Sequence, residues 1–517
     1  MSTTTTSRFR RGFGWGTAGV VTGLAGLAAS LLAASLMGVR VNPVVGVAES
    51  VIRLTPGALA EKAISIVGTL DKPLLVTGVV VVLVAVFWYA GRSAAVSNSR
   101  PLVVFVVLAA IGGVAVLTRP HARPTDIVPV VVGGLVWLVL LPWLVKPLAE
   151  AGAEATEAGE QADNNGSRRT FLFQAGGVLA GAAAVGLASR FVGRGRRQVE
   201  ETRKLLRLPV TLRPTPAGAE VGLEKMPSWR TSNGSFYLIH TAVVVPAIDP
   251  KKWRLRIHGL VDRELTLTYQ DLLDRQLTEM WMTLNCVSNP VGGDLIGNAW
   301  WSGIRIADLL AEAGVQEGAD AVKQTSEDGW TCGTPIEALT DTRGAMLAIG
   351  MNGVPLPLEH GFPVRMIVPG LYGFVSATKW LVDLQVTKFE DFSAYWTDRG
   401  WSEQAPVKLA SRIDVPGDGD SVPAGNVRVG GSAWRQYVGV EAVEISLDGG
   451  EWAPIALGAV PSNDTWVQWA GSVNVEAGKH ELRVRARDKH GETQTGTVRD
   501  VVPDGATGWH TIEFNAE

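Results

Sequence analysis

The residue with the clearest chemical potential is Cys286, in the stretch LNCVSNPVGGD at 284–294. It is one of two cysteines in 517 residues, and neither it nor Cys332 lies in a CxxC pair. Two cysteines can form one bond or act singly, so their number does not identify the compartment. A Gly/Asn-rich turn after the run WMTL is an unusual place for a structural cysteine. The pattern therefore favours a thiol that binds a ligand over a thiol with a structural role.

A second candidate is Arg365, which interrupts the otherwise apolar run VRMIV at 364–368. An arginine in an apolar strand costs several kcal/mol unless its charge is compensated. A buried ion pair or an exposed strand end would satisfy it. An anionic ligand would also do so, and Lys379 adds a second positive group nearby. A third polar segment, TSNGSFYLIHTAVVVP at 231–246, brings Asn233 to the predicted entry of a strand.

Taken together, these segments resemble the sulfite oxidase family of molybdenum–pterin enzymes. The resemblance covers about residues 205–517 and rests on LNCVSNPVGGD, HGFPVRMIVPGLYG and TKWL, in that order. It implies an α+β molybdopterin domain, Mo-molybdopterin as cofactor and two-electron oxygen-atom transfer. In the family the loop cysteine binds molybdenum as its thiolate, a soft ligand suited to this metal, so Cys286 is the expected metal ligand.

The resemblance also implies cofactor contacts from Asn233, Tyr237, His240, Thr325, His360, Arg365, Ser376 and Lys379. Ser376 and Lys379 are expected to close over the cofactor phosphate, whose charge would compensate Arg365. An equally open interpretation is that His240 is a packed polar residue that does not contact the cofactor. Tyr372 is expected to act in catalysis, lining a substrate pocket with Tyr395 and Arg399. Cys332 is expected to be structural.

The sequence after Cys286 puts sulfite in doubt as the substrate. Sulfite-oxidising members carry arginines close after the metal-binding cysteine, whereas Cys286 is followed by VSNPVGG. Members that repair methionine sulfoxide lack the C-terminal sandwich. We therefore expect a small substrate, with a sulfur-containing compound as one option, without naming it.

Four uncharged apolar stretches, each long enough to cross a bilayer, precede this region. They lie between Arg11 and Arg40, Lys72 and Arg92, Arg100 and Arg119, and Asp126 and Lys146. The stretch 56–70 is amphipathic and is expected to lie along the membrane surface. Buried core helices can also be apolar, but four in a row favour a membrane module.

A fifth apolar stretch at 167–190 begins with Arg168 and Arg169 and resembles an internal twin-arginine export signal. The alternative is an ordinary fifth span whose arginines anchor its cytoplasmic end. Both interpretations place the residues after 190 outside the plasma membrane of a bacterium, if the N-terminus is inside. Arg8, Arg10 and Arg11 agree with this orientation, whereas the arginines at 190–197 oppose it.

The elements that position these residues follow from composition and periodicity. We expect a four-span membrane module at 1–146, an acidic Ala/Gly-rich linker at 147–166, a twin-arginine-like signal and fifth span at 167–195, a molybdopterin-binding catalytic domain at 205–402 and an immunoglobulin-like, dimerisation-type β-sandwich at 404–517. Within the catalytic domain, apolar spacing predicts a helix at 305–314 ended by Gly314. Alternating strands with glycine turns predict the sandwich.

The near balance of 47 basic and 50 acidic side chains gives no sign of nucleic-acid binding. Expected partners are membrane lipid, a second copy through the C-terminal domain, and a separate cytochrome or quinone-linked carrier. The membrane module has one histidine, His121, in a predicted loop, whereas haem b needs axial ligands on helices, so we expect no haem in this chain.

Two other classes of function compete. A cofactor-free, membrane-tethered binding or assembly module would leave Arg365 and Lys379 without a counter-charge, which argues against it. A transporter would be expected to carry ionisable residues within its spans, and the four stretches contain none.

Overall fold

The computed structural model describes residues 3–39, 42–56, 59, 70–97, 99–119, 122–157, 165–192 and 194–517. These form two compact units. One contains residues 1–198 with 241–246, and the other contains residues 199–240 with 247–517.

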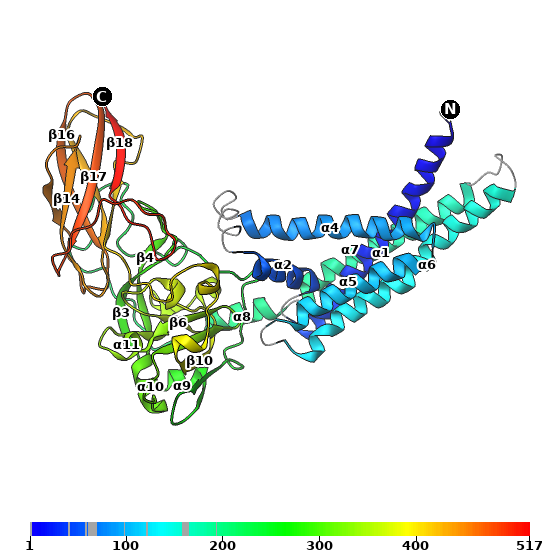
Figure 1. Ribbon diagram of the computed structural model, residues 1–517, viewed down its shortest axis with the longest axis horizontal. Helices are drawn as coiled ribbons and strands as arrows, with labels where there is room; N and C mark the ends of the chain where they lie inside the picture. The colour runs from blue at the N-terminus through cyan, green and yellow to red at the C-terminus, as the bar shows by residue number, and fades with distance from the viewer. Residues whose placement is uncertain are drawn as a thin grey trace. The chain divides into compact units, whose positions relative to one another are not determined.

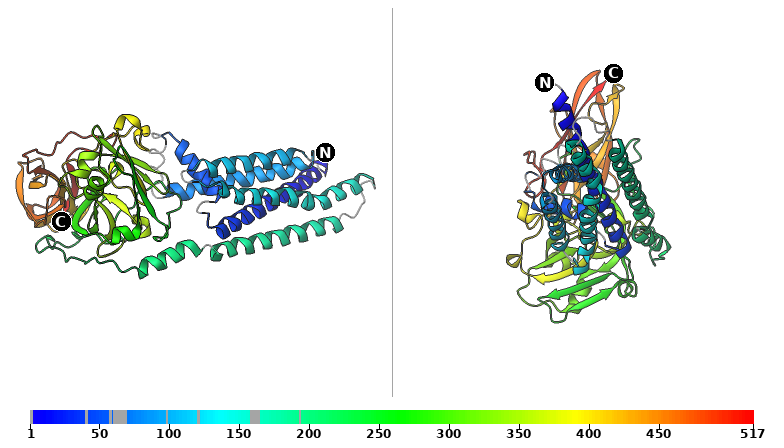
Figure 2. Two further views of the ribbon diagram at one scale, coloured as in Figure 1. Left: turned by 90° about the horizontal axis from the view of Figure 1, so that it is seen from below. Right: turned by 90° about the vertical axis from the view of Figure 1, so that its right-hand side faces the viewer.

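The first unit is built from long apolar helices that run alongside one another (Figures 1 and 2). They are α1 (Thr3–Met37), α4 (Asp71–Ala94), α5 (Ser99–Leu117), α6 (Val128–Glu157) and α7 (Asn165–Val192), joined by the short helices α2 (Pro43–Leu54) and η2 (Pro124–Ile127). Five segments are long and apolar enough to cross a membrane: Gly14–Met37, Asp71–Ala94, Ser99–Leu117, Pro124–Glu150 and Arg169–Leu187. The five predicted spans are therefore confirmed as helices of spanning length, which indicates a multi-pass membrane protein.

Helix α1 lies against α4, α6 and α7. At its crossing with α4, Gly19 and Gly91 bring the two backbones so close that a Cβ on either would overlap the other helix. Trp137 of α6 donates from Nε1 to the Gly23 carbonyl of α1 over 3.1 Å. Its ring packs against Phe87, with centroids 5.5 Å apart. Small residues at crossings and satisfied polar groups are what helix packing in lipid requires.

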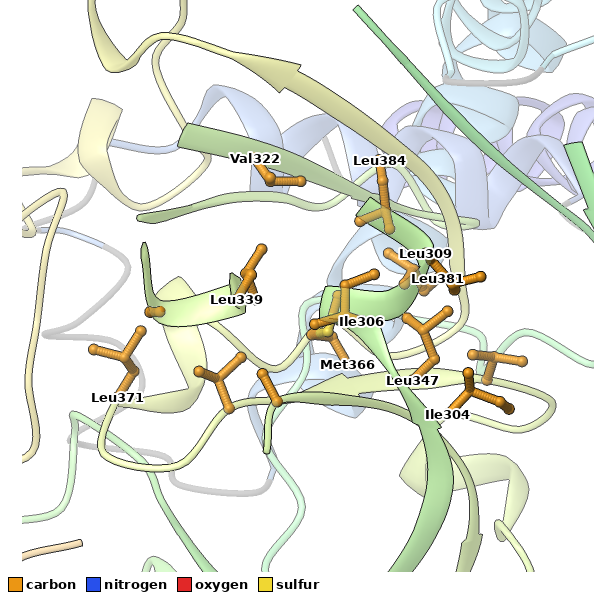
Figure 3. Close-up of a cluster of buried hydrophobic side chains, with 14 of the residues drawn as sticks. Ile304, Ile306, Leu309, Val322, Leu339, Leu347, Met366, Leu371, Leu381 and Leu384 are labelled. Carbon is orange, nitrogen blue, oxygen red and sulfur yellow. The ribbon is translucent and has the colours of Figure 1, made fainter. Parts of the chain in front are cut away.

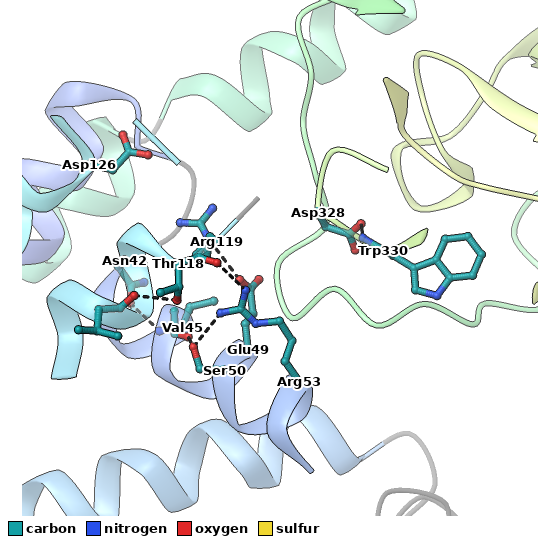
Figure 4. A network of polar contacts seen from close by, with 12 residues as sticks. Asn42, Val45, Glu49, Ser50, Arg53, Thr118, Arg119, Asp126, Asp328 and Trp330 are labelled. Carbon is teal, nitrogen blue, oxygen red and sulfur yellow. Dashed lines mark hydrogen bonds and ion pairs between the residues drawn. The ribbon is translucent and has the colours of Figure 1, made fainter. Parts of the chain in front are cut away.

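Polar contacts join α2 to the end of α5 (Figure 4). Glu49 pairs with Arg119 over 3.5 Å. Arg53 donates to the Thr118 carbonyl over 3.2 Å. The Asn42 side chain caps α2 by accepting from the Val45 N–H. The contacts of Arg53 and Asn42 satisfy backbone groups at helix ends that would otherwise be unpaired.

One boundary differs from expectation. Helix α6 continues through Pro147 to Glu157, so the first half of the expected linker at 147–166 is helical. The run LAEAGAEATE consists mainly of good helix formers, which explains the extension. Residues 158–164, His121 and most of the amphipathic stretch 56–70 lie outside the described residues.

The second unit begins with the last part of helix α8 (Arg194–Leu205) and an irregular segment, and its first domain then forms two sheets. The first sheet has the order β2-β1-β10-β5-β6, from β1 (Arg254–Gly259), β2 (Leu265–Thr268), β5 (Ala321–Ser326), β6 (Thr331–Pro335) and β10 (Leu381–Thr387). The second has the order β3-β4-β7-β8 with β9 on β7, from β3 (Thr278–Asn285), β4 (Ile296–Arg305), β7 (Met346–Met351), β8 (Val354–Pro355) and β9 (Arg365–Ile367).

Helices α9 (Tyr269–Leu273), α10 (Ile306–Ala313) and α11 (Ile336–Thr340) complete this domain. Helix α10 ends at Gly314, whose φ of 71° is the left-handed conformation that glycine adopts readily, as predicted. Ile306, Leu309 and Leu347 lie in one buried cluster (Figure 3). The interface between α10 and β7 is thus part of the hydrophobic core that fixes the ends of the strands.

This core gives a stability prediction. Leu309 is fully buried, so Leu309→Ala should leave a cavity and lower the free energy of unfolding by about 2–5 kcal/mol. Thermal or denaturant unfolding of the detergent-purified protein would measure this. Ala311 is exposed on the same helix, and Ala311→Ser should change stability by less than about 0.5 kcal/mol. Equal effects of the two substitutions would show that α10 does not pack as described.

The C-terminal domain is one eight-stranded sheet with the order β11-β13-β16-β15-β14-β17-β18-β12. Its strands are β11 (Ala410–Val415), β12 (Ser421–Val422), β13 (Gly425–Trp434), β14 (Val440–Leu447), β15 (Ala453–Leu457), β16 (Val467–Val475), β17 (Gly478–Asp488) and β18 (His510–Ala516). Strand β11 also lies against β17 and β18, so the sheet curls over a shared core that contains Val429, Val484 and Phe514. The predicted immunoglobulin-like β-sandwich is confirmed as a C-terminal β domain in this curled form.

Candidate functional site

Cys286 directly follows β3 and opens the loop that returns to β4. Its N–H donates to the Leu295 carbonyl over 2.9 Å, and its carbonyl accepts from Asn289 N–H over 3.2 Å. The Asn289 side chain accepts from Leu295 N–H over 2.9 Å. From the C-terminal domain, Arg412 donates to the Gly293 carbonyl over 2.7 Å. The loop is therefore fixed from both ends, and the thiol that it carries is buried and not in a disulfide.

Arg365 begins β9 and is 2% exposed. Its Nη1 donates to the His360 carbonyl over 3.2 Å and its Nη2 to the Ala377 carbonyl over 3.3 Å. The guanidinium lies 5.3 Å from the ring centroid of Trp301. Among residues 194–517, no carboxylate forms an ion pair with it, and its Nε has no hydrogen-bond partner. Burial lowers the pKa of Arg365 to about 10, which reflects a cation without a counter-charge.

Two further expected residues surround this arginine. Lys379 donates to the Glu359 carbonyl over 3.0 Å. His360, in the short helix η3 (Leu358–His360), contacts the Asn233 carbonyl through Nε2 over 2.8 Å. Its Nδ1 is buried without a partner among the described residues. Burial, followed by the positive charges of Lys379 and Arg365, lowers the pKa of His360 to about 4.

The 231–246 segment supplies the aromatic wall of the site. The Phe236 ring stacks on Tyr237 at 5.3 Å and meets the His360 ring edge-on at 5.6 Å. Burial and the neighbouring Cys286 raise the pKa of Tyr237 well above its ordinary value, whereas Arg365 opposes the rise. Tyr237 thus lies within electrostatic range of both the thiol and the guanidinium. The expected strand at this segment is wrong, because the Thr231 N–H donates to Asn298 instead of forming a ladder.

The other expected residues lie at different distances from this cluster. Ser376, just after the short helix η4 (Gly373–Val375), is buried and donates to the Tyr372 carbonyl over 2.9 Å. His240 meets Trp380, the neighbour of Lys379, edge-on at 5.6 Å. Thr325 is on β5, paired with Thr331 and Asp383, and no contact among the described residues joins it to the cluster.

Tyr395 and Arg399 lie against each other, with the guanidinium 3.9 Å from the ring centroid. Neither is among the residues that line the pocket beside Tyr372, and their role at the substrate stays a prediction. Cys332 contacts Thr378 over 3.3 Å, and burial raises its pKa to about 12, as expected for a structural thiol. Sequence reasoning missed Asn285 and Arg412. Asn285 was adjacent to the thiol in LNC, but nothing in the local pattern could have indicated Arg412.

The residues fit a molybdenum cofactor. Arg365 needs a negative charge that the described carboxylates do not supply, and Lys379 lies within electrostatic range of the same His360. A phosphate group satisfies buried guanidinium and ammonium groups through charge-assisted hydrogen bonds. Cys286 supplies a soft sulfur donor. Burial raises the pKa of its thiol, whereas hydrogen bonds around Ser288 and the charge of Lys379 oppose that rise.

The pKa of His360 gives a prediction for the cofactor-free protein. Its pKa is lower in the folded state than in the unfolded state, so the unfolded chain binds the extra proton first as pH falls. Stability is therefore full above about pH 6.5 and declines towards pH 4, by up to roughly 3 kcal/mol. His360→Gln should flatten this part of the pH–stability curve, measured by denaturant unfolding. An unchanged slope would contradict a buried neutral His360.

Comparison with known proteins decides the family. Residues 242–396 match the model of the oxidoreductase molybdopterin binding domain. An uncharacterized oxidoreductase, YuiH of Bacillus subtilis, is 36% identical over 178 residues, which are 34% of this chain and 86% of that protein. The chain belongs to the sulfite oxidase family of molybdopterin oxidoreductases. The matched range contains every residue expected to bind the cofactor except Asn233, Tyr237 and His240.

Other members of the sulfite oxidase family extend the match. Human mitochondrial sulfite oxidase is 30% identical over 308 residues, and the match covers 50% of this chain and 56% of that protein. The chain thus spans little more than half of that relative. The sulfane dehydrogenase SoxCD of Paracoccus pantotrophus has the same fold, with a TM-score of 0.50 at 22% identity over 62% of this chain and 92% of that one. The catalytic domain, the C-terminal β domain and the enzyme class are therefore as predicted.

Proposed function

We propose that this protein is a membrane-anchored oxidoreductase that holds Mo-molybdopterin through Cys286 and catalyses two-electron oxygen-atom transfer on a small substrate. The observation that carries the proposal is the buried guanidinium of Arg365. Among the described residues, the Arg365 guanidinium donates only to carbonyl oxygens. Tyr237 lies within electrostatic range of both this guanidinium and the Cys286 thiol. A buried thiol and a buried guanidinium without a described carboxylate partner, both within electrostatic range of Tyr237, suit a metal-dithiolene group with a phosphate tail.

Each residue has a proposed task. When bound, the cofactor supplies the two-electron redox chemistry, and the protein supplies binding and orientation. Cys286 is the proposed metal ligand, held in place by its backbone bond to Leu295. Arg365, Lys379 and Ser376 bind the phosphate. The remaining proposed cofactor contacts are Asn233, Tyr237, His240, Thr325 and His360, with Tyr372 facing the substrate.

The membrane arrangement completes the proposal. The five helices of spanning length are proposed to anchor the chain in the plasma membrane of a bacterium. The catalytic domain is proposed to lie on the extracytoplasmic side, exported folded through the twin-arginine-like segment. Electrons pass to or from a separate cytochrome or quinone-linked carrier, and the C-terminal domain pairs two copies.

The decisive experiment is the molybdenum and pterin content of protein purified from a host that makes the cofactor. About one molybdenum and one pterin per chain are expected. If protein purified from cofactor-replete cells contains no molybdenum, the proposal is refuted and a binding or assembly module of the same fold is favoured. Protease access to the catalytic domain in intact spheroplasts tests the side of the membrane separately.

A further inference from the structure

A small pocket lies between the Cys286 loop and the C-terminal β domain. Asn285 and Tyr372 line it from the catalytic domain. Ser411 and Trp434 line it from the C-terminal domain, which belongs to the same compact unit. The room that a water molecule can occupy in this pocket is about 20 Å³. Since roughly 10–15 Å³ of such room is enough for one water, the pocket has the size of a single-water site.

The polar groups of the lining suit a water. Asn285 is 1% exposed, and its Nδ2 has no hydrogen-bond partner among the described residues. Its Oδ1 accepts from Gln436 Nε2, which fixes the orientation of the amide. Ser411 donates to Gln494 Oε1 over 2.7 Å, so the Ser411 oxygen keeps lone pairs that can accept. A water with such partners is stable when buried, and it removes the cost of an unpaired buried donor.

The charge of the lining also favours water. All of the lining residues lie within 285–508, which the structure describes throughout, and none of them is acidic or basic. An ion would lose its hydration in this pocket without meeting an opposite charge, which is unfavourable. A neutral water needs only hydrogen bonds, so it is the better occupant.

Tyr372 links the pocket to the surface. Its hydroxyl oxygen accepts from the Lys408 N–H over 3.4 Å, which leaves its own proton available to donate. The hydroxyl also lies against Gly505, where a Cβ would come within 2.7 Å of it. Next to Gly505, the Asp504 carboxylate accepts from Lys408 Nζ over 2.7 Å, and the Asp504 side chain is 46% exposed. One side of the Tyr372 hydroxyl is thus close to a carboxylate that solvent reaches.

The electrostatics of Tyr372 agree with this position. Burial raises the pKa of Tyr372 to about 12, and the charges of Asp504 and Cys286 add to the rise. The phenol is therefore within electrostatic range of both the thiol and the surface carboxylate. Because it stays protonated at neutral pH, it can pass on a proton only by accepting one as it donates its own.

We propose that this pocket holds an ordered water that, together with the Tyr372 hydroxyl, carries protons between the Cys286 site and Asp504 at the surface. This inference rests on the proposed function. Oxygen-atom transfer to a substrate X follows X + H2O → XO + 2H+ + 2e−, and the proposed cytochrome or quinone-linked carrier takes the electrons. Turnover in this direction releases protons from a buried site, and the reverse reaction takes up the same number. The pocket water hands each proton to the Tyr372 oxygen as the hydroxyl gives its own proton towards Asp504.

A high-resolution crystal structure of the full chain tests the water directly. We expect an ordered water within hydrogen-bond distance of Asn285 Nδ2 and the Tyr372 hydroxyl, with or without bound cofactor. Ala506 lines the pocket from a half-buried loop position, so Ala506→Leu should fill the room and displace the water. A parent structure without an ordered water in the pocket would overturn the inference.

Proton uptake tests the relay separately from substrate turnover. Reduced methyl viologen, a one-electron dye, is mixed anaerobically with the oxidised, molybdenum-loaded protein, and a pH indicator follows the protons taken from solvent. Tyr372→Phe should slow proton uptake at least about tenfold while the dye is oxidised at the parent's rate. Ala506→Leu should have the same effect. Tyr269→Phe is the matched control, because it removes a buried hydroxyl that does not line the pocket, and it should change neither rate.

Two results of this experiment would contradict the relay. One is proton uptake at the parent's rate in Tyr372→Phe, and the other is equal slowing of proton uptake and dye oxidation, as a purely structural role would produce. Absence of molybdenum in the parent protein is a different result, because it would refute the proposed function itself and leave the crystallographic test of the water unaffected.

Discussion

Replacing Cys286 with serine should reduce turnover by roughly 1000-fold or more, because the soft thiolate is lost from the metal. The chain should still fold, since the loop is held by backbone bonds to Leu295 and by Arg412, neither of which uses the thiol. Pterin should be retained for the same reason, because Arg365 and Lys379 are unchanged. X-ray absorption at the molybdenum edge should show one sulfur neighbour fewer.

Cys332 is the matched control, since it is the other buried, free cysteine of the chain. Cys332 lies on β6, where its thiol contacts Thr378, and it is not in the Cys286 loop. Cys332→Ala should cost about 1 kcal/mol of stability and leave the metal spectrum unchanged. A Cys286→Ser protein with an unaltered metal spectrum would show that another residue binds the molybdenum.

The second large effect is expected at Arg365 and has opposite signs in the two forms of the protein. Without cofactor, the guanidinium is a buried cation without a carboxylate partner among the described residues, and Arg365→Met should leave stability unchanged or raise it by about 1 kcal/mol or more. With cofactor, the same change leaves the phosphate without its buried partner. Cofactor binding should then weaken by about 3 kcal/mol, or roughly 100-fold.

Thermal unfolding of protein from cofactor-deficient cells measures the first effect, and pterin retained after gel filtration measures the second. Arg365→Lys is the matched variant, because it keeps the charge but loses the planar fork that donates to both His360 and Ala377. It should fall between the parent and Arg365→Met in cofactor retention. If Arg365→Met instead strongly destabilises the cofactor-free protein, the arginine has a structural role and the phosphate site lies elsewhere.

Local pattern was enough to predict much of this protein. Uninterrupted apolar runs predicted the spanning helices, because length and hydropathy alone decide whether a helix can cross a bilayer. The 3.6-residue spacing around Leu309 with Gly314 at its end predicted α10. Arg365 stood out because a charge in an apolar strand requires a partner wherever the strand lies. These features depend on neighbours a few residues away.

Only the tertiary structure could decide the features that depend on segments far apart in the chain. The 231–246 segment was expected to be a strand, but its backbone groups bond to Asn298 and Asn352 instead. Gln436 orients Asn285 from 151 residues away, and Arg412 holds the Cys286 loop from 119 residues away. The pairing of Arg412 with Asp414 is close in sequence, yet only the fold places Arg412 beside the Cys286 loop. Periodicity and local charge carry no information about such contacts, because the distance that matters is through space and not along the chain.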